Sequence, residues 1–233
     1  MQKLSIIIPI YNEANTVEEL VRRVEAVSLD NIEKELVLID DGSTDGSVEI
    51  LKKYQDRHKV IFKEKNNGKG DSIKIGFQNA SGDIIIIQDA DLEYDPNEYK
   101  ELITPILEDK ADVVYGSRFL TDRPHRVLDF WHYVGNKILT LFSNMFTNIY
   151  LTDMETCYKA FNRKALDIIK DKLVSPRFGI EPEMTALVAR NKLRIYEIGI
   201  SYYGRTYAKG KKINWKDGVS AIWCIIKFNI FSK

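Results

Sequence analysis

The sequence leads its most apolar segment directly into a cluster of acids in "IIIIQDADLEYDP", residues 84–96. Four consecutive isoleucines are typical of a strand that is buried on both faces, as in a parallel sheet. Asp89 and Asp91 follow two positions apart, and in an extended chain two such side chains point to the same side. Asp95-Pro96 is typical of a turn that begins a helix. The stretch therefore predicts a central strand with two carboxylates at its carboxyl end.

Strand and helix patterns alternate on both sides of this stretch. Such alternation is typical of an α/β fold, with a mainly parallel sheet that is flanked by helices and joined by right-handed crossovers. The predicted strands cover residues 4–10, 35–40, 60–62, 83–88, 111–116, 157–161 and 194–200. Asn15 is expected to cap the first helix together with Glu18. Further helices are predicted around Val48 and Leu51 and over residues 71–79, 97–108, 127–151 and 181–191, with an amphipathic piece at 219–231.

Composition limits the classes of protein to which the chain can belong. Its 233 residues fit one large domain, and 44% of them are hydrophobic, which is enough for a substantial core. Lys+Arg and Asp+Glu both number 34, so the chain lacks the basic field of a nucleic-acid-binding protein. Cys157 and Cys224 stand far apart and form no metal-binding pattern with the three histidines, which favours free thiols in the cytosol.

Membrane-spanning segments are not expected. No stretch reaches the roughly 18 apolar residues that a spanning helix needs. Residues 127–151 and 219–231 come closest, but both are too polar or too short, and the N-terminus is typical of a first strand rather than of a signal peptide.

Polar residues follow three of the predicted strands at their carboxyl ends. These ends carry Pro9 to Glu13, Asp40-Asp41, and the Asp89/Asp91 pair. In an open parallel sheet, ligands bind at the carboxyl ends of the strands. The segment "DDGS" alone is more typical of an Asx turn that caps the next helix. The three strand ends taken together favour a binding site.

Asp89 and Asp91 also suit a metal ion. Two converging carboxylates are typical ligands of Mg²⁺ or Mn²⁺, which keep several waters and bridge substrate phosphates. Both could instead cap the following helix. Nearby, the loop "NNGKGDS" at residues 66–72 has glycines around Lys69 and opens a helix, which favours phosphate binding. A plain left-handed turn explains the same loop.

Cationic residues gather late in the chain. Arg118 follows a predicted strand, and Arg123, Arg126, Arg205, Lys209, Lys211 and Lys212 flank the two amphipathic segments. A solvated surface explains Arg123 and Lys209. The segment "GRTYAKGKK", which holds Arg205, Lys211 and Lys212, is similar to an anchor at a membrane interface with a phosphate-binding loop.

Five ordered motifs resemble a known family. "SIIIPIYNE", "VLIDDGSTDGS", "NNGKGDSIKIGFQNASGDIIIIQDADLEYDP", "DVVYGSRF" and "DMETCYKAF" resemble the signatures of family 2 inverting glycosyltransferases. The resemblance runs from Lys3 to about Phe228 and is greatest to dolichol-phosphate mannosyltransferases and bacterial polyprenyl-phosphate glycosyltransferases. It implies the GT-A fold, a Rossmann-like, mainly parallel sheet flanked by helices, here with a C-terminal amphipathic helix.

The resemblance implies roles for particular residues. Those that would hold the nucleotide sugar are Pro9, Tyr11, Glu13, Asp41, Lys69, Asp89, Ala90 and Asp91. The DxD motif, Asp89 and Asp91, would hold Mg²⁺ or Mn²⁺, with Glu93 as a further ligand. The residues implied for the acceptor phosphate are Arg118, Arg126, Arg205, Lys211 and Lys212. Asp89, Asp91, Arg118 and Asp153 would be the catalytic residues.

Several positions depart from the family pattern. Glu93 stands where the mannosyltransferases often carry Gln, and Lys211 stands where a serine is usual, which leaves the identity of the donor open. In "DMETCYKAF", Asp153 and Lys159 keep the family's chemistry, but Cys157 replaces a glycine.

The implied reaction is transfer of a sugar, with inversion and with a metal ion, from GDP-mannose or a UDP-hexose to a polyprenyl or dolichyl phosphate. An ionised phosphate needs no general base, whereas a hydroxyl acceptor on a glycan or protein would need one, and Asp153 is the candidate. A non-catalytic nucleotide-binding module is a third interpretation.

These interpretations divide the single domain into three parts. Residues 1–117 would form the nucleotide-sugar-binding half, 118–218 the acceptor-binding half, and 219–233 an amphipathic tail that associates with a membrane. The protein would then be cytoplasmic and peripheral at the inner face of the membrane, an arrangement that leaves room for a membrane-protein partner.

Overall fold

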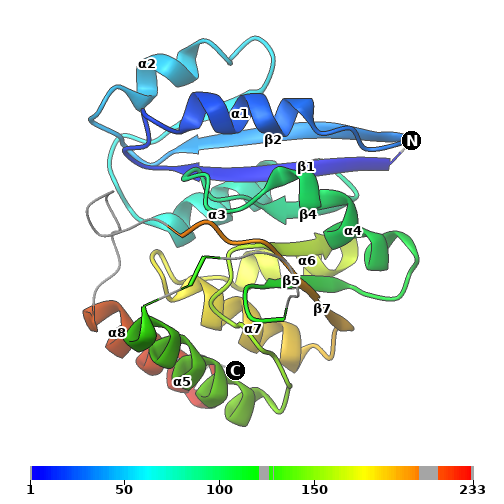
Figure 1. Ribbon diagram of the computed structural model, residues 1–233, viewed down its shortest axis with the longest axis vertical. Coiled ribbons are helices and arrows are strands. Elements are labelled where there is room, and N and C mark those ends of the chain that lie inside the picture. The colour runs from blue at the N-terminus through cyan, green and yellow to red at the C-terminus, as the bar shows by residue number, and fades with distance from the viewer. Residues whose placement is uncertain (1, 121–125, 128, 205–214, 232–233) are drawn as a thin grey trace.

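A seven-stranded sheet forms the centre of the protein (Figure 1). The computed structural model describes residues 2–120, 126–127, 129–204 and 215–231. The strands lie in the order β3-β2-β1-β4-β6-β5-β7, and all neighbours are parallel except β6, which is antiparallel to both β4 and β5. Their bounds are β1 Gln2–Ile10, β2 Ile32–Asp40, β3 Lys59–Phe62, β4 Ile84–Ile87, β5 Val113–Ser117, β6 Lys159–Asn162 and β7 Ile195–Gly199. The predicted α/β fold with a mainly parallel sheet is confirmed.

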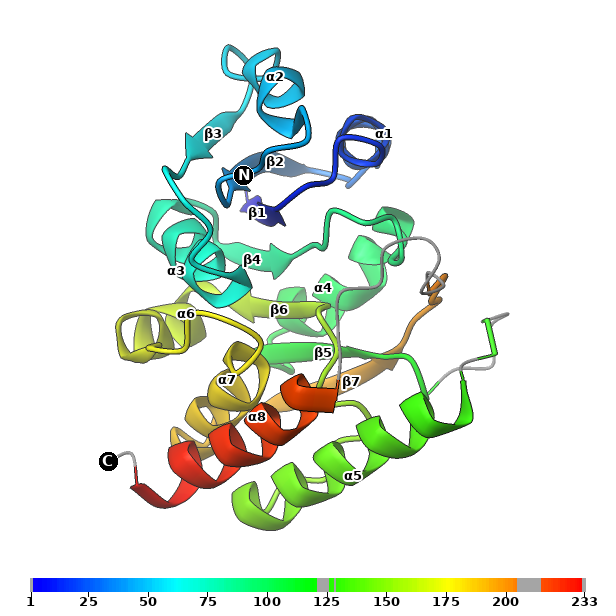
Figure 2. The same ribbon diagram turned by 90° about the vertical axis from the view of Figure 1, so that its left-hand side faces the viewer.

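Helices cover both faces of the sheet. Figure 2 shows α1 (Val17–Ala26) and α4 (Tyr99–Leu107) on one face and α3 (Lys69–Asn79) and α6 (Arg163–Ile169) on the other. Beyond β7, three helices pack against one another: α5 (Phe130–Thr147), α7 (Ile180–Arg190) and α8 (Trp215–Ile226). The remaining elements are α2 (Ser47–Lys52), the short 3₁₀ helices η1 (Pro96–Glu98) and η2 (Lys170–Lys172), and the π-helical η4 (Lys227–Phe231). Of the described helices, none has the length and apolar character needed to span a bilayer.

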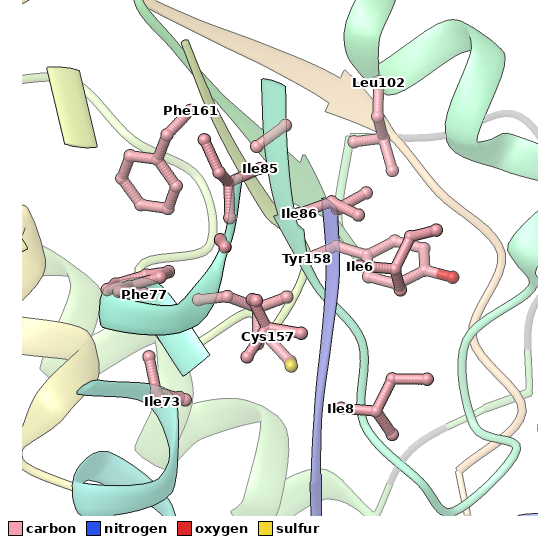
Figure 3. Close-up of a cluster of buried hydrophobic side chains, with 14 of the residues drawn as sticks. Ile6, Ile8, Ile73, Phe77, Ile85, Ile86, Leu102, Cys157, Tyr158 and Phe161 are labelled. Carbon is pink, nitrogen blue, oxygen red and sulfur yellow. The ribbon is translucent and has the colours of Figure 1, made fainter. Parts of the chain in front are cut away.

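The isoleucines of β4 are buried because the sheet is covered on both sides. Successive side chains of a strand point to opposite faces. In Figure 3, Ile85 therefore lies on the side of Phe77 from α3, while Ile86 lies on the side of Leu102 from α4. All four isoleucines of β4 are at most 2% exposed, so the strand holds the acidic segment after it on a rigid support.

Some element boundaries differ from the sequence predictions. The first helix begins at Val17 rather than after an Asn15 cap: Thr16 occupies the capping position, and its hydroxyl donates to a carboxylate oxygen of Glu13 (2.9 Å). The predicted Asn15/Glu18 cap is therefore wrong. Helix α5 is shorter than the predicted 127–151 because Asn148 adopts a left-handed conformation (φ 54°) that ends it.

Candidate active site

An open pocket lies at the carboxyl ends of β1, β2 and β4, as expected for a sheet of this kind. Its volume of about 1180 Å³ exceeds the roughly 300–1,000 Å³ of an ordinary small-molecule site. It therefore has room for a nucleotide sugar and part of an acceptor. The predicted site residues that line it are Pro9, Tyr11, Glu13, Asp41, Lys69, Asp89, Ala90, Asp91, Glu93 and Arg118.

Asp41 holds the loop that precedes α3. Its carboxylate accepts hydrogen bonds from the backbone N–H groups of Asn67 (3.0 Å) and Gly68 (2.8 Å) and pairs with the ammonium group of Lys63. Gly68 has φ +106°, and a Cβ at this position would lie 2.5 Å from the carbonyl oxygen of Pro176. Only glycine fits such a turn. The ψ of Gly68, 164°, lies outside the left-handed helical region, so the loop is not the plain left-handed turn, and it places Lys69 at the first position of α3.

Lys69 connects two acids across the floor of the pocket. Its ammonium nitrogen lies 2.9 Å from Oδ1 of Asp89 and 3.2 Å from Oε1 of Glu181, in the first turn of α7. Burial by itself lowers the pKa of Lys69, but the charges of Asp89 and Glu181 and the hydrogen bond to Asp89 together outweigh it and hold this pKa well above its usual value. Lys69 is therefore a permanent cation beside the first aspartate of the DxD motif.

The acidic turn after β4 is held by its own backbone and by Tyr202. The N–H group of Glu93 donates to Oδ1 of Asp91 (3.1 Å), and the hydroxyl of Tyr202 donates to Oε2 of Glu93 (2.7 Å). Asp89, Asp91 and Glu93 all line the pocket. Among the described residues, however, no three His, Cys, Asp or Glu side chains converge to hold a metal ion, so the three predicted ligands do not form one cluster.

Asp91 fits a divalent cation in another way. Mg²⁺ is usually held by one or two carboxylates together with substrate phosphates and waters, so a cluster of three protein carboxylates is not needed. Asp89 pairs with Lys69, and Asp91 lines the pocket just after the central strand. The oxygen chemistry and position of Asp91 thus suit Mg²⁺ or Mn²⁺ beside a bound diphosphate.

Arg118 and Asp153 form a buried ion pair. The carboxylate of Asp153, which is fully buried, accepts from Nε and Nη2 of Arg118 (both 2.7 Å) and from its backbone N–H (3.0 Å). Burial by itself lowers the pKa of Arg118, but the charge of Asp153, its hydrogen bonds and the nearby tyrosines together raise it well above its usual value. The guanidinium also lies over the rings of Tyr202 (5.2 Å) and Phe119 (5.7 Å). Arg118 lines the pocket and Asp153 stands behind it.

The predicted acceptor-phosphate residues do not all meet at this pocket. Arg126 donates from its guanidinium to the carbonyl oxygen of Gly204 and from its backbone N–H to that of Tyr202 (3.3 Å), and it is not among the lining residues. Arg123, Arg205, Lys209, Lys211 and Lys212 lie outside the described residues.

The acceptor side of the pocket is formed by helices. Residues of α5 and α8 line it: Trp131, His132, Gly135, Asn136, Leu139, Gly218 and Ala221. Both helices also expose large apolar side chains, among them Trp131 (79% exposed), Leu141 (58%), Met145 (70%) and Trp223 (58%). The pocket therefore opens beside an apolar surface.

Sequence reasoning missed several residues that line the pocket, namely Tyr94, Glu155, Arg177, Phe178, Glu181 and Tyr202. Glu181 carries no clear signal, because an acid in the first turn of a helix is ordinarily explained by the helix dipole. Glu155 stands inside the quoted segment "DMETCYKAF" and could have been singled out as its second carboxylate, two positions after Asp153.

This geometry agrees with a comparison against known families. The family model of Glycosyl transferase family 2 matches residues 5–169, more than half of the 233 residues. The chain belongs to glycosyl transferase family 2. The matched region runs from Ser5 within β1 to the end of α6, and it includes the acidic turn and the Arg118–Asp153 pair.

Two curated relatives of this family 2 glycosyltransferase have names that specify a lipid phosphate as the acceptor. The UDP-N-acetylglucosamine–dolichyl-phosphate N-acetylglucosaminyltransferase of Methanococcus voltae is 27% identical over 227 aligned positions, which cover 90% of this chain and 89% of that protein. The undecaprenyl-phosphate 4-deoxy-4-formamido-L-arabinose transferase of Pseudomonas savastanoi pv. phaseolicola is 34% identical over 169 positions, 70% of this chain. The chain spans about half the length of this second relative, 48% of which is covered.

Solved structures confirm the GT-A fold. Glucosyl-3-phosphoglycerate synthase from Mycobacterium tuberculosis, in complex with Mn²⁺, UDP and phosphoglyceric acid, superposes with a TM-score of 0.75 at 16% identity. The match covers 98% of this chain and 79% of the synthase.

Proposed function

We propose that this chain transfers a sugar from a nucleotide-sugar donor to a polyprenyl phosphate, with inversion at the anomeric carbon. One observation carries the proposal: a single pocket combines the DxD turn with the helices α5 and α8, which also expose large apolar side chains. The DxD turn suits the diphosphate of a donor, and the apolar helices α5 and α8 suit a lipid that carries a phosphate. The names of the archaeal and bacterial relatives support this acceptor class.

The side chains divide the work of the reaction. An ionised phosphate oxygen of the acceptor attacks the anomeric carbon in line as the nucleoside diphosphate leaves, and this step needs no base. Lys69 and Arg118 supply fixed positive charge to the pocket. Asp91 would hold Mg²⁺ or Mn²⁺, which when bound supplies positive charge beside the leaving diphosphate.

Transfer to a hydroxyl acceptor is less well supported. It requires a general base within reach of the acceptor, and Asp153 is the candidate. Both carboxylate oxygens of Asp153 accept from Arg118, and the side chain stands behind the pocket. Asp153 is better suited to orient Arg118 toward a phosphate.

The names of the relatives favour one of the two donor classes. The archaeal relative is named for a UDP sugar, and the sugars named in the two relatives are N-acetylglucosamine and 4-deoxy-4-formamido-L-arabinose. We therefore favour a UDP-linked N-acylated or neutral sugar over GDP-mannose, and we propose that the enzyme works at a membrane surface.

The test is a panel of UDP- and GDP-sugars incubated with the full chain, a polyprenyl phosphate and Mg²⁺ or Mn²⁺, with the lipid-linked product measured by mass spectrometry. We expect product from at least one UDP-sugar and none after EDTA treatment. Nucleotide-sugar binding without turnover on any lipid phosphate would instead identify a binding module, and transfer to a sugar hydroxyl alone would contradict the acceptor class.

Asp91→Asn is expected to lower kcat about 100-fold or more, because it removes the charge that would hold the metal beside the leaving group. Thermal unfolding should be unchanged. Asp30→Asn is the matched control, since Asp30 lies on the surface and pairs with the exposed Lys100 (3.1 Å), away from the pocket. Activity of Asp91→Asn near that of the control would remove Asp91 from the reaction.

A further inference from the structure

Two carboxyl groups in the pocket have no role in the proposed transfer step. Glu155 precedes β6, and Glu181 lies in the first turn of α7; both line the pocket. Glu181 is only 3% exposed, and its Oε2 is buried without a hydrogen-bond partner among the described residues. Oε1 of Glu155 is likewise buried, and it also has no hydrogen-bond partner among the described residues.

Unpaired buried oxygens are unusual in a folded protein. A buried polar atom that loses water and gains no partner destabilises the fold, so most such atoms are satisfied. Two of them on neighbouring acids in one pocket point to a ligand that supplies the missing donors. The terminal torsion of a glutamate is soft, which lets each carboxyl group turn toward such a ligand.

The position of the pair corresponds to the sugar end of a donor. Lys69 pairs with both Glu181 and Asp89, so Glu181 lies in the pocket next to the DxD turn. From there the pocket continues to α5 and α8, which pack against α7. A nucleotide sugar runs in the order base, ribose, diphosphate and sugar, and with its diphosphate at Asp91 its sugar lies toward Glu181 and Glu155.

The charges around the pair favour an uncharged sugar. Lys69, Lys159 and Arg118 are the cations near the pair, and Asp89, Glu181 and Asp153 balance them. Burial, together with the nearby charge of Glu181, raises the pKa of Glu155 to about 8. Glu155 therefore carries a proton at neutral pH, and a protonated carboxyl group both donates and accepts hydrogen bonds. No net negative charge is left for an ammonium group.

We propose that Glu155 and Glu181 form the subsite that selects the donor sugar, with hydroxyl groups of an uncharged pyranose donating to their unpartnered oxygens. This inference rests on the proposed function and names the part of the substrate that the function left open. Hydroxyl groups that satisfy buried acceptors give strong discrimination, because a sugar that lacks them leaves the acceptors unpaired.

The test measures the affinity for UDP and for UDP-N-acetylglucosamine separately, by calorimetry on the full chain with Mn²⁺. In Glu155→Ala, the Kd of the nucleotide sugar should rise about tenfold, while the Kd of UDP stays within about twofold. Glu155→Gln keeps a donor and an acceptor and should stay within about threefold of wild type for both. Equal weakening of both ligands, or no weakening of either, would overturn the subsite.

A second measurement uses the wild-type chain and so does not depend on the folding of a variant. UDP-glucosamine, with a free ammonium group, should bind no more tightly at pH 6.5 than UDP-glucose. Tighter binding by about tenfold or more would show an anionic subsite and contradict the proposal. Binding of nucleotide sugars without transfer to lipid phosphate would refute the proposed function and leave the subsite standing.

Discussion

Arg118 and Asp153 show how a single pair can be both structural and functional. Both are almost fully buried, and an isolated buried charge is costly, so neither is tolerable without the other. The pair holds a guanidinium rigidly at the wall of the pocket. Rigid placement matters because a donor that is aimed in advance costs no reorganisation during the reaction.

Asp153→Asn is expected to lower the free energy of unfolding by about 3–5 kcal/mol, because it leaves the charge of Arg118 buried and unpaired. Urea unfolding measures the loss. The double variant Arg118→Met, Asp153→Leu should recover most of this stability, since it removes both charges, but it should remain inactive. An Asp153→Asn protein as stable as wild type would contradict the buried pair.

Glu155 predicts a pH dependence of stability. Its folded-state pKa is raised from 4.5 to about 8 by burial and by Glu181, with Lys159, Arg118 and Asp153 as the other charged groups around it. Between these two pH values the folded state holds a proton that the unfolded state releases. The contribution of Glu155 to the free energy of unfolding is therefore fully present below about pH 4.5 and is lost as pH rises to about 8. Glu155→Gln removes the titration, and its stability relative to wild type should increase between about pH 5 and pH 8 in urea titrations. A pH-independent difference would contradict the raised pKa.

Among single residues, the sequence predicted the donor side of the pocket better than its far side. Pro9, Asp41 and Asp91 lie at strand ends, and a strand end has a known place in a parallel sheet. Asp153 shows the limit of prediction from the sequence. An aspartate can act as a general base or pair with an arginine, and only its neighbours in the fold distinguish the two roles. Glu181 could not be found, since it reaches the pocket only through the packing of α7.

At the scale of elements, α3 lies unusually close to the sheet. A Cβ on Gly76 would be 2.2 Å from Cγ2 of Ile7 in β1 and 3.2 Å from Cδ1 of Ile39 in β2. The glycine is therefore a packing requirement, although it lowers the intrinsic helix propensity of α3. Close contact at this point fixes α3, whose first residue is Lys69, against the sheet.

Gly76→Ala is expected to lower the free energy of unfolding by about 1–3 kcal/mol, because the added methyl group overpacks the interface with β1. Gly135→Ala on α5 is the matched control, since a Cβ at Gly135 would meet nothing within 4 Å outside its own helix. The control should gain up to about 1 kcal/mol from helix propensity. Chemical denaturation of both variants measures the change in the free energy of unfolding. A Gly76→Ala protein more stable than wild type would show that α3 can move away from β1.

Helices and strands were predictable where the hydrophobic pattern was long. Their direction and boundaries were less predictable where neighbouring elements set them. The alternation of apolar runs and helical periodicity indicated all seven strands. The direction of β6 could not be predicted, because the pattern of so short a strand is the same in either direction and only the neighbours β4 and β5 set it. The start of α1 differs because the hydroxyl of Thr16 contacts Glu13, an interaction within one turn that the capping pattern did not include.

At the scale of the whole molecule, the exposed apolar face of α5 and α8 predicts binding to a lipid surface. Leu141→Lys with Met145→Lys should weaken cosedimentation with anionic vesicles about tenfold or more, because two apolar side chains leave the interface. Both residues are well exposed (58% and 70%), so thermal unfolding should change little. Leu107→Lys at the end of α4, away from α5 in Figures 1 and 2, is the control. Full vesicle binding by the double variant would remove this face from the proposal.

The place of β6 between β4 and β5 has a consequence for synthesis of the chain. Both neighbours leave the ribosome before β6, and about 45 residues separate the end of β5 from the end of β6. At roughly 5–20 residues per second, these 45 residues take about 2–9 s to synthesise, and the apolar edge of β4, which is complete 30 residues before β5, stays open for longer still. Such an edge is a site for wrong pairing, so the growing chain is exposed to misfolding until Asn162 emerges.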